Sequence, residues 1–298
     1  MQLITAYITV VLIWATTPLT IQWSSESVGF LFGISSRIVL GAVFALSIII
    51  LMGKKIALNK KAVHTYIAGG SGIFTAMLCV YWSSQFIPSG WISIIYGVTP
   101  IFTGLLAMKI LGEHGLSLFR TIAILFCILG LYTMLETGLE RDPKTAYGII
   151  GVIMSSIFYS FSMVIVKKIN AEIDTYSTMT GGLIVAAILF FTVWSFSGSE
   201  IPNHIPKRAG FSIVYLASIG SVIGFYLFYY ILKRVEATRV SLITLLTPVC
   251  ALILGHVFNN EPITEEIMRG CVFILSGLIL FEFEGAMRKK VKITTYRG

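Results

Sequence analysis

The chain has 298 residues, of which 56% are hydrophobic and only 12% are charged, and its formal net charge is +8. A soluble domain carries roughly 25% charged residues, so this composition leaves too few charges to cover a surface in water. Lys and Arg occur in short clusters between apolar runs, a pattern that indicates basic loops beside a membrane and no nucleic-acid partner.

Ten stretches are long and apolar enough to cross a lipid bilayer, for which a helix needs about 20 residues. We expect helices because a backbone in hydrocarbon must bond within its own segment, and the runs lack the alternation of barrel strands. The first stretch has no basic leader and no small-residue cleavage site, so we expect it to be retained. The predicted fold is an all-α membrane protein with spans at Leu3–Trp23, Phe30–Met52, Val63–Ile87, Ser89–Leu111, Leu116–Glu136, Tyr147–Val166, Tyr176–Phe196, Phe211–Leu232, Thr238–Phe258 and Ile267–Phe283.

The basic residues fall mainly on one side of these spans. If the N-terminus is cytoplasmic, sixteen Lys and Arg residues lie in inside connections and the tail, five lie outside, and Arg37 lies within a span. This asymmetry predicts a multi-pass protein of the bacterial inner membrane with both termini in the cytoplasm.

The four cysteines all lie within apolar runs. They form no CxxC pair and have no histidine at metal-ligand spacing. We therefore expect small buried apolar side chains, with no disulfide, no metal site and no cofactor.

The second half of the chain reads as a copy of the first. Val98-Thr99-Pro100 aligns with Leu246-Thr247-Pro248 at an offset of 148 residues, and the same offset takes Glu113 to Glu261. Five helices separate the two copies, so the copies cross the membrane in opposite directions. Inverted repeats give many secondary transporters two interchangeable states around one central site. The alternative is chance similarity between two apolar segments.

Pro100 and Pro248 lie near the middle of their predicted helices. Each removes a backbone hydrogen bond and is expected to bend its helix. The freed carbonyl is tolerated only against protein or a water-filled cavity. A gating bend and a packing kink without a role in transport both fit this pattern.

Together these features resemble the drug/metabolite transporter superfamily, specifically its EamA-like family. The resemblance rests on two five-helix halves, on Trp14-Ala15-Thr16-Thr17-Pro18 in the first helix and on Arg37 early in the second. Each half also has a Thr-Pro about a dozen residues before Gly112-Glu113 or Asn260-Glu261. The resemblance covers nearly the whole chain, with repeats at residues 1–138 and 145–285 and a basic cytoplasmic tail at 286–298.

The resemblance implies a basket of ten helices whose cavity is lined by the first, third and fourth helices and their counterparts. It also implies movement of small metabolites, often the export of amino acids or related compounds. The second copy has Asn260 where the first has Gly112, and no arginine matches Arg37. These departures argue against a two-fold symmetric substrate site.

Arg37 is the one charge placed well within a predicted span, about seven residues from the outer end of its helix. A charge at full depth costs at least ~2.5 kcal/mol, so such residues are rarely incidental. Arg37 fits bidentate binding of a substrate carboxylate. It equally fits a structural arginine that bonds neighbouring helix carbonyls or reaches lipid headgroups.

Aromatic and amide side chains gather on the expected pore helices. Such rings offer apolar walls with polar edges, which suit amphipathic small molecules. Packing or an interfacial belt is the alternative role for any one of them. Besides Arg37, the candidate substrate contacts are Trp14, Thr17, Tyr81, Trp82, Gln85, Tyr96, Tyr159, Tyr226 and Tyr230.

No acidic residue lies near the middle of any predicted span. Proton-coupled transporters usually place a carboxylate or histidine deep in the bundle, so we expect a facilitator or an exporter whose coupling does not use a buried carboxylate. Glu113 and Glu261 fall between one helix end and the next helix start. There we expect each to accept backbone N–H bonds and to hold a tight turn in its own half.

Two other function classes compete with transport. Gly69-Gly70-Ser71-Gly72 fits the GxSG motif of an intramembrane serine protease, but His256 lies toward the other side of the membrane and His64 lies in or beside a loop. A non-transporting membrane scaffold or sensor also fits an apolar bundle. The sequence favours a non-enzymatic secondary transporter that moves amino acids or related carboxylated or amphipathic metabolites by alternating access. No oligomeric state is predicted.

Overall fold

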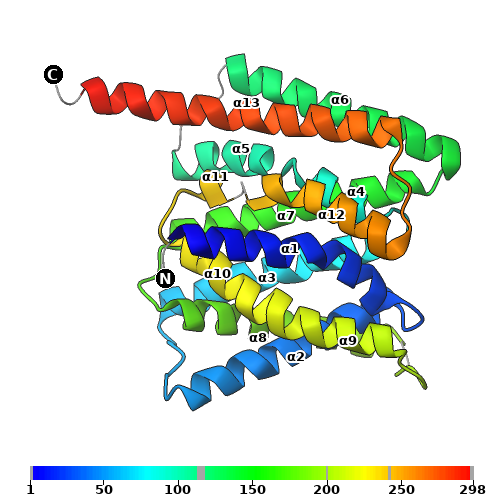
Figure 1. Cartoon of the computed structure of the whole chain (residues 1–298). Coiled ribbons are helices and arrows are strands. Elements are labelled where there is room, and N and C mark those ends of the chain that lie inside the picture. Colours follow the sequence, from blue (N-terminus) through cyan, green and yellow to red (C-terminus); the bar gives the residue numbers. More distant parts are fainter. Residues whose placement is uncertain (1–2, 113–117, 199–200, 241–242, 296–298) are drawn as a thin grey trace.

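A computed structural model describes residues 3–112, 118–198, 201–240 and 243–295, and these residues form helices and connections with no strand. Figure 1 shows the helices as a bundle of roughly parallel and antiparallel rods. The helices are α1 (Leu3–Ser25), α2 (Phe30–Leu51), α3 (Lys60–Ser83), α4 (Ser89–Tyr96), α5 (Thr99–Leu111), α6 (Leu118–Arg141), α7 (Thr145–Ile169), α8 (Thr175–Phe196), α9 (Lys207–Tyr215), the π-helix η1 (Leu216–Ile223), α10 (Gly224–Leu232), α11 (Ala237–Val240), α12 (Ile243–Asn259) and α13 (Glu265–Thr295).

Seven segments among the described residues are long and apolar enough to cross a membrane. Two shorter apolar stretches lie within α6 and α12, at Thr121–Met134 and Thr247–Asn259. The seven segments are α1, α2, α3, α4 with α5 (Ser89–Leu111), α7, α8, and α9 through α10 (Lys207–Leu232).

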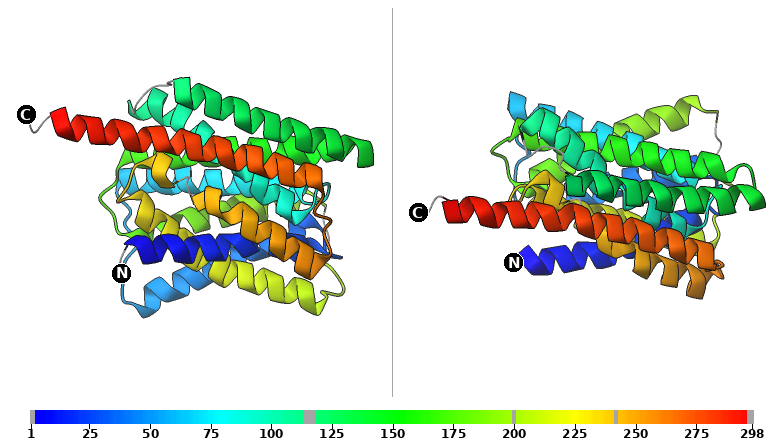
Figure 2. Two further views of the ribbon diagram at one scale, coloured as in Figure 1. Left: turned by 45° about the horizontal axis from the view of Figure 1, so that its top comes forward. Right: turned by 90° about the horizontal axis from the view of Figure 1, so that it is seen from above.

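The ends of the helices divide between two sides of the bundle. α1 begins and α13 ends on the left in Figure 1, and both views of Figure 2 agree. α5 also ends on that side, whereas α12 ends on the opposite side. α6 and α13 pack closely against each other as an outer layer, while α3 packs against both α7 and α8, and α1 packs against α9, α10 and α12.

The fourth predicted span is interrupted, and the interruption precedes Pro100. α4 ends at Tyr96 and α5 starts at Thr99, so Pro100 lies in the first turn of α5 and does not bend the middle of a continuous helix. A proline is tolerated in a first turn because its missing N–H has no intrahelical partner there. The Tyr96 carbonyl, four residues before the proline, instead accepts a hydrogen bond from Thr99 Oγ1 at 2.5 Å. The expected bend in mid-helix is therefore replaced by a break between two helices, just before the proline.

The proline of the second half has a different position. Pro248 lies inside α12, and the predicted helix Thr238–Phe258 consists of α11 and α12. The predicted span Phe211–Leu232 contains a π-helical stretch, η1, between α9 and α10. π-helical segments are rare and often mark functional sites.

Gly112 and Asn260, which the 148-residue offset aligns, have the same backbone conformation. Gly112 follows α5 with φ 69°, and Asn260 follows α12 with φ 51°. Glycine adopts this left-handed region freely, and asparagine is among the few other residues that visit it at helix ends. The replacement of glycine by Asn260 therefore preserves the turn.

Candidate functional site

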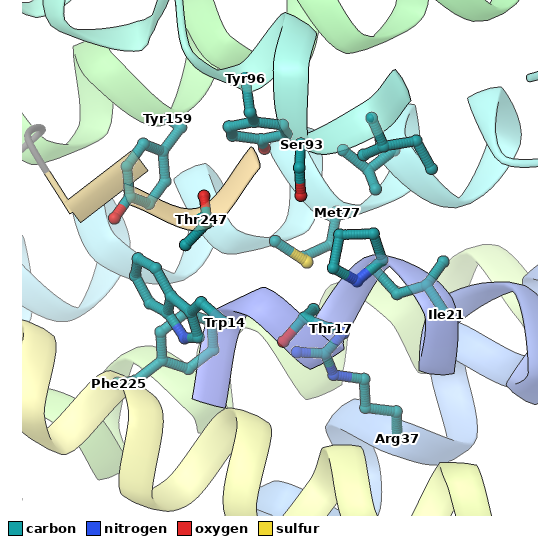
Figure 3. Close-up of a pocket in the computed structure, with 13 residues that line it drawn as sticks. Trp14, Thr17, Ile21, Arg37, Met77, Ser93, Tyr96, Tyr159, Phe225 and Thr247 are labelled. Carbon is teal, nitrogen blue, oxygen red and sulfur yellow. The ribbon is translucent and has the colours of Figure 1, made fainter. Parts of the chain in front are cut away.

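A cavity lies inside the bundle where helices of both halves meet (Figure 3). The empty space between its walls is about 640 Å³, and this figure includes space open to solvent. Its walls are Trp14, Thr17, Pro18 and Ile21 of α1, Arg37 of α2, Met77 and Val80 of α3, Ile92, Ser93 and Tyr96 of α4, Tyr159 of α7, Phe225 of α10 and Thr247 of α12.

Arg37 brings a positive charge to this otherwise mostly apolar cavity. Its side chain is 2% exposed. Nε donates to Ser221 Oγ at 3.1 Å, and Nη1 donates to Tyr81 Oη at 3.4 Å. Both partners are neutral hydroxyls, and no carboxylate of the described residues forms an ion pair with Arg37. The guanidinium is thus held in place while part of its donor capacity stays unused.

Ser221 reaches Arg37 from the π-helix η1. A side chain at the neighbouring Gly220 would come within 3.6 Å of Arg37 Nη2. The wider turn of η1 and this small residue therefore lie directly beside the guanidinium. π-helical segments are frequently found at functional sites.

Two tyrosines in the cavity wall differ in their hydrogen bonding. The Tyr96 hydroxyl bonds Ser155 Oγ at 2.5 Å, and Ser155 donates in turn to the Ala76 carbonyl at 2.6 Å. Among the described residues, neither the Tyr159 hydroxyl nor Ser93 Oγ forms a side-chain hydrogen bond. These two groups and Arg37 are among the polar groups that the site can offer to a ligand.

Aromatic rings close one side of the cavity, as Figure 3 shows for Trp14, Tyr159 and Phe225. The Trp14 ring lies 6.2 Å from Tyr159 and 6.4 Å from Phe225, both edge to face. Tyr159 in turn lies 6.4 Å from Tyr96. Edge-to-face rings pack rigidly, so this wall presents a fixed apolar surface opposite the polar groups.

Five predicted contacts, Trp14, Thr17, Arg37, Tyr96 and Tyr159, line the cavity. Three others on or beside α3 do not line it. Tyr81 is fully buried behind Arg37, and it also accepts a hydrogen bond from Ser24 Oγ at 3.3 Å. Trp82 is 37% exposed and packs on Phe86, and Gln85 is exposed. Successive residues on a helix point about 100° apart, and here Tyr81 points into the bundle while Trp82 points toward its surface.

Tyr226 and Tyr230 lie in a separate aromatic and basic cluster. Tyr226 stacks on Tyr176 at 4.4 Å, and the Arg234 guanidinium lies 3.6 Å from the centre of the Tyr230 ring. Neither tyrosine lines the cavity. A role in substrate binding therefore has no geometric support for Tyr81, Trp82, Gln85, Tyr226 or Tyr230.

Several wall residues were not predicted, although the sequence contains two signals that point to some of them. Pro18 and Ile21 continue the helical spacing of Trp14 on α1, so they share its face. Thr247 belongs to the repeated Thr-Pro motif. Ser93 matches Ser241 at the same 148-residue offset. The remaining wall residues, Met77, Val80, Ile92 and Phe225, carried no signal that distinguished them from ordinary core residues.

Glu261 is buried, at 8% exposed, and its carboxylate reaches the other half of the chain. It accepts hydrogen bonds from the backbone N–H groups of Ser89 at 2.9 Å and Gly90 at 3.0 Å, at the start of α4. Its own turn is held by backbone atoms, because Glu261 N donates to the Gly255 carbonyl at 3.1 Å. The expectation of a local turn therefore describes the backbone of Glu261 and misses its side chain. Glu113 lies outside the described residues.

The geometry around Ser71 does not support an intramembrane serine protease. Ser71 Oγ donates to the Ile67 carbonyl of its own helix at 2.7 Å. His256 Nδ1 instead contacts the Glu261 carbonyl at 2.9 Å. No histidine among the described residues forms a hydrogen bond with Ser71, so a general base is missing.

Comparison with known families decides the identity of the bundle. Two segments, residues 2–135 and 146–283, match the EamA-like transporter family. The chain belongs to the EamA-like transporter family. The predicted family is thus confirmed, and the EamA-like chain is a multi-pass membrane protein built from two repeats.

Related proteins are named as transporters. The chain is 24% identical over 291 residues to "Uncharacterized transporter YoaV" of Bacillus subtilis (strain 168), which covers 95% of this chain and 97% of that protein. It is 25% identical over 217 residues to a "Probable amino-acid metabolite efflux pump" of Escherichia coli (strain K12), covering 70% and 72%. A solved structure described only as "Crystal structure of protein" superimposes with a TM-score of 0.68 at 16% identity, covering 93% and 96%, and shares the fold.

Proposed function

We propose that this EamA-like protein is a secondary transporter that moves small carboxylated metabolites, such as amino acids, by alternating access. One observation carries the proposal: the buried Arg37 guanidinium faces a cavity and has no carboxylate partner among the described residues. An unpaired buried charge is costly, and a bound carboxylate would compensate it with bidentate hydrogen bonds. The name of the efflux relative, which refers to amino-acid metabolites, agrees with this substrate class.

The cavity wall adds a second requirement for the substrate. Apolar and aromatic side chains such as Trp14 and Phe225 cover most of the wall. A solute with a carboxylate at one end and an apolar body would place its charge at Arg37 and its body against the rings. The Tyr159 hydroxyl and Ser93 Oγ would accept or donate the remaining hydrogen bonds.

The transporter would contain ten spans in two inverted five-helix repeats. α6, α12 and α13 would supply the three spans beyond the seven described above. Matched pairings of helices support a two-fold relation between the halves: α3 packs on α7 as α10 packs on α1, and α5 packs on α7 as α12 packs on α1. The shared backbone conformation of Gly112 and Asn260, on turns at opposite sides of the bundle, gives further support.

We place both termini in the cytoplasm of a bacterial cell, with the protein in the inner membrane. The asymmetry of Lys and Arg supports this orientation. Cysteines introduced next to the two aligned turns should then react with an impermeant reagent from opposite sides. Reaction of both from the same side would contradict the inverted topology.

Uptake into proteoliposomes tests the proposed function. Purified protein would be screened against radiolabelled amino acids and related carboxylates, with and without a pH gradient. We expect uptake of at least one carboxylated solute by the parent and loss of that uptake in Arg37→Ala. A scaffold or sensor would move no solute in any condition, and equal carboxylate uptake by the two proteins would remove the role of Arg37.

A further inference from the structure

A polar network joins the two halves at the side of the bundle where α12 ends. We call it the Glu261 network: Gln22, Trp23, Asn259, Glu261 and the N–H groups of Ser89 and Gly90. Asn259 Nδ2 donates to Glu261 Oε1 and to Gln22 Oε1, each at 3.1 Å. Gln22 Nε2 donates to the Ile87 carbonyl at 2.9 Å, and Trp23 Nε1 donates to Asn259 Oδ1 at 3.3 Å. The network therefore fastens α1, the start of α4 and the end of α12 to one another.

Two glycines let the backbones approach closely enough for this network. A methyl group on Gly255 would lie 2.3 Å from Glu261 Oε2 and 3.0 Å from Ser89 Oγ. A methyl group on Gly90 would lie 2.7 Å from Leu252 Cδ2. The distances of 2.3 and 2.7 Å are shorter than real Cβ contacts, so α4 and α12 approach this closely because neither position carries a side chain.

The network directly adjoins the cavity. Gln22 follows the wall residue Ile21 on α1. Ser89 precedes the wall residue Ile92 by three residues on α4, or ~4.5 Å at the helical rise of 1.5 Å per residue. The same helices that enclose the cavity therefore end in the network about one turn further on.

We infer that the Glu261 network is the gate that closes the cavity toward this side of the membrane. The inference rests on the proposed alternating access, and with cytoplasmic termini the gate faces the outside. Opening requires α4 to separate from α12, which removes the two N–H groups from the carboxylate. Water then replaces the protein donors, so the charge stays solvated when the gate is open.

The charge of Glu261 sets how tightly the gate closes. A carboxylate binds N–H groups at a helix start more strongly than a neutral amide does, since charge and helix dipole both contribute. Glu261→Gln keeps the shape and one acceptor oxygen but removes the charge. Gly255→Ala leaves Glu261 in place and displaces its carboxylate sterically. Both variants should shift the equilibrium toward the open gate.

Labelling of a cavity cysteine tests the gate. In a protein whose four native cysteines are replaced by alanine, Ser93→Cys places a reporter thiol in the cavity wall. Reaction with a membrane-impermeant methanethiosulfonate added on the Glu261 side is then followed by mass spectrometry. We expect Glu261→Gln and Gly255→Ala to accelerate labelling on the order of tenfold, the effect of one charge-assisted hydrogen bond.

Two matched variants serve as controls. Glu266→Gln changes an exposed carboxylate on the same side, which forms an ion pair with Arg269 on its own helix. Gly210→Ala adds a methyl group to a helix where the nearest atom is 3.7 Å away. Neither control should change the labelling rate.

The outcomes separate the gate from the proposed function. If the parent transports solute and neither Glu261→Gln nor Gly255→Ala changes labelling of folded protein, the gate inference is wrong and the transporter proposal stands. If the parent with its native cysteines moves no solute in the same vesicles, the transporter proposal is wrong and the gate falls with it. Faster labelling in both variants, with neither control affected, supports the gate.

Discussion

Two buried charges in this protein have opposite surroundings. Among the described residues, only Arg37 and Glu261 are both charged and buried. Glu261 accepts hydrogen bonds from Ser89, Gly90 and Asn259, all within 3.1 Å. Arg37 donates to two neutral hydroxyls and faces a cavity. In an apolar bundle, a charged group whose hydrogen bonds all go to protein holds helices together. A charged group that has unused hydrogen-bond donors and faces a cavity is available to a ligand.

Removing Glu261 should therefore have the largest effect on stability. Glu261→Ala leaves the two N–H groups at the start of α4 buried without an acceptor, each at a cost of about 1–3 kcal/mol. We expect a loss of about 3 kcal/mol in the free energy of unfolding in detergent. Glu266→Ala, an exposed control, should change it by less than about 0.5 kcal/mol. Equal losses in the two variants would show that the contacts of Glu261 carry no special stability.

Arg37 should show the reverse behaviour. Arg37→Met fills similar volume without a charge, and replacing a poorly compensated buried charge by an apolar group is often neutral or stabilising. We expect stability within about 1 kcal/mol of the parent and a fall in carboxylate transport on the order of 100-fold.

Parallel thermal unfolding and proteoliposome uptake would measure the two effects of Arg37→Met. A large drop in stability with transport retained would make Arg37 a structural arginine. The exposed Arg208, paired with Glu26, provides the control, and Arg208→Met should leave transport unchanged.

The two wall tyrosines allow the same comparison, between a group that is hydrogen-bonded to protein and one that is not, within one residue type. Tyr96 has a hydroxyl partner in Ser155, whereas the Tyr159 hydroxyl has none among the described residues. Tyr96→Phe should lower stability by about 1 kcal/mol and affect transport less than Tyr159→Phe does. Tyr159→Phe should leave stability unchanged and lower transport roughly 3–10-fold, as the loss of one hydrogen bond to a ligand would. If the two substitutions had the same effects on stability and transport, the hydrogen bonding of a wall tyrosine would not predict whether it binds substrate.

The smallest expected effect on stability concerns Asp174, an exposed carboxylate that accepts hydrogen bonds at the start of α8. It accepts bonds from Ser177 N at 3.0 Å and Ser177 Oγ at 2.7 Å. Partial burial acts to raise the pKa of Asp174, but the Ser177 bonds and the charge of Lys54 outweigh it and lower the pKa.

Because the folded-state pKa of Asp174 is lowered, its stabilisation is present above the unfolded-state pKa of about 3.9 and is lost as pH falls through the folded-state value. Solvent screening limits it to below about 1 kcal/mol. Comparing thermal unfolding of the parent and Asp174→Asn at pH 7 and pH 3 would measure it. The advantage of the parent should be smaller at the lower pH, and a difference independent of pH would contradict this account.

Much of the fold could be predicted because the length of each apolar stretch is a strong indication of a membrane-spanning helix. The helices and the position of Arg37 within a span followed from residue type and spacing. The cavity-facing side of each helix was harder to predict, since lipid and protein core both favour apolar side chains. Tyr81 and Trp82 show the difficulty: they are adjacent and similar, yet one is buried behind Arg37 and the other is 37% exposed.

Other features depend on contacts that no local pattern encodes. The π-helix η1 carries no distinctive sequence, although it positions Ser221 beside Arg37. The bond from Ser89 to Glu261 joins residues 172 positions apart. A local reading of Glu261 therefore identified a helix-capping carboxylate but assigned it to the wrong helix.

The central claim is that Arg37 recognises a carboxylate in the cavity, and matched pairs of solutes test it most directly. Uptake of an amino acid or related acid identified in the screen would be compared with uptake of its primary amide, which has nearly the same shape and no carboxylate charge. The account predicts that the parent prefers the acid by on the order of tenfold or more and that Arg37→Met abolishes the preference. Equal uptake of acid and amide by the parent would contradict it.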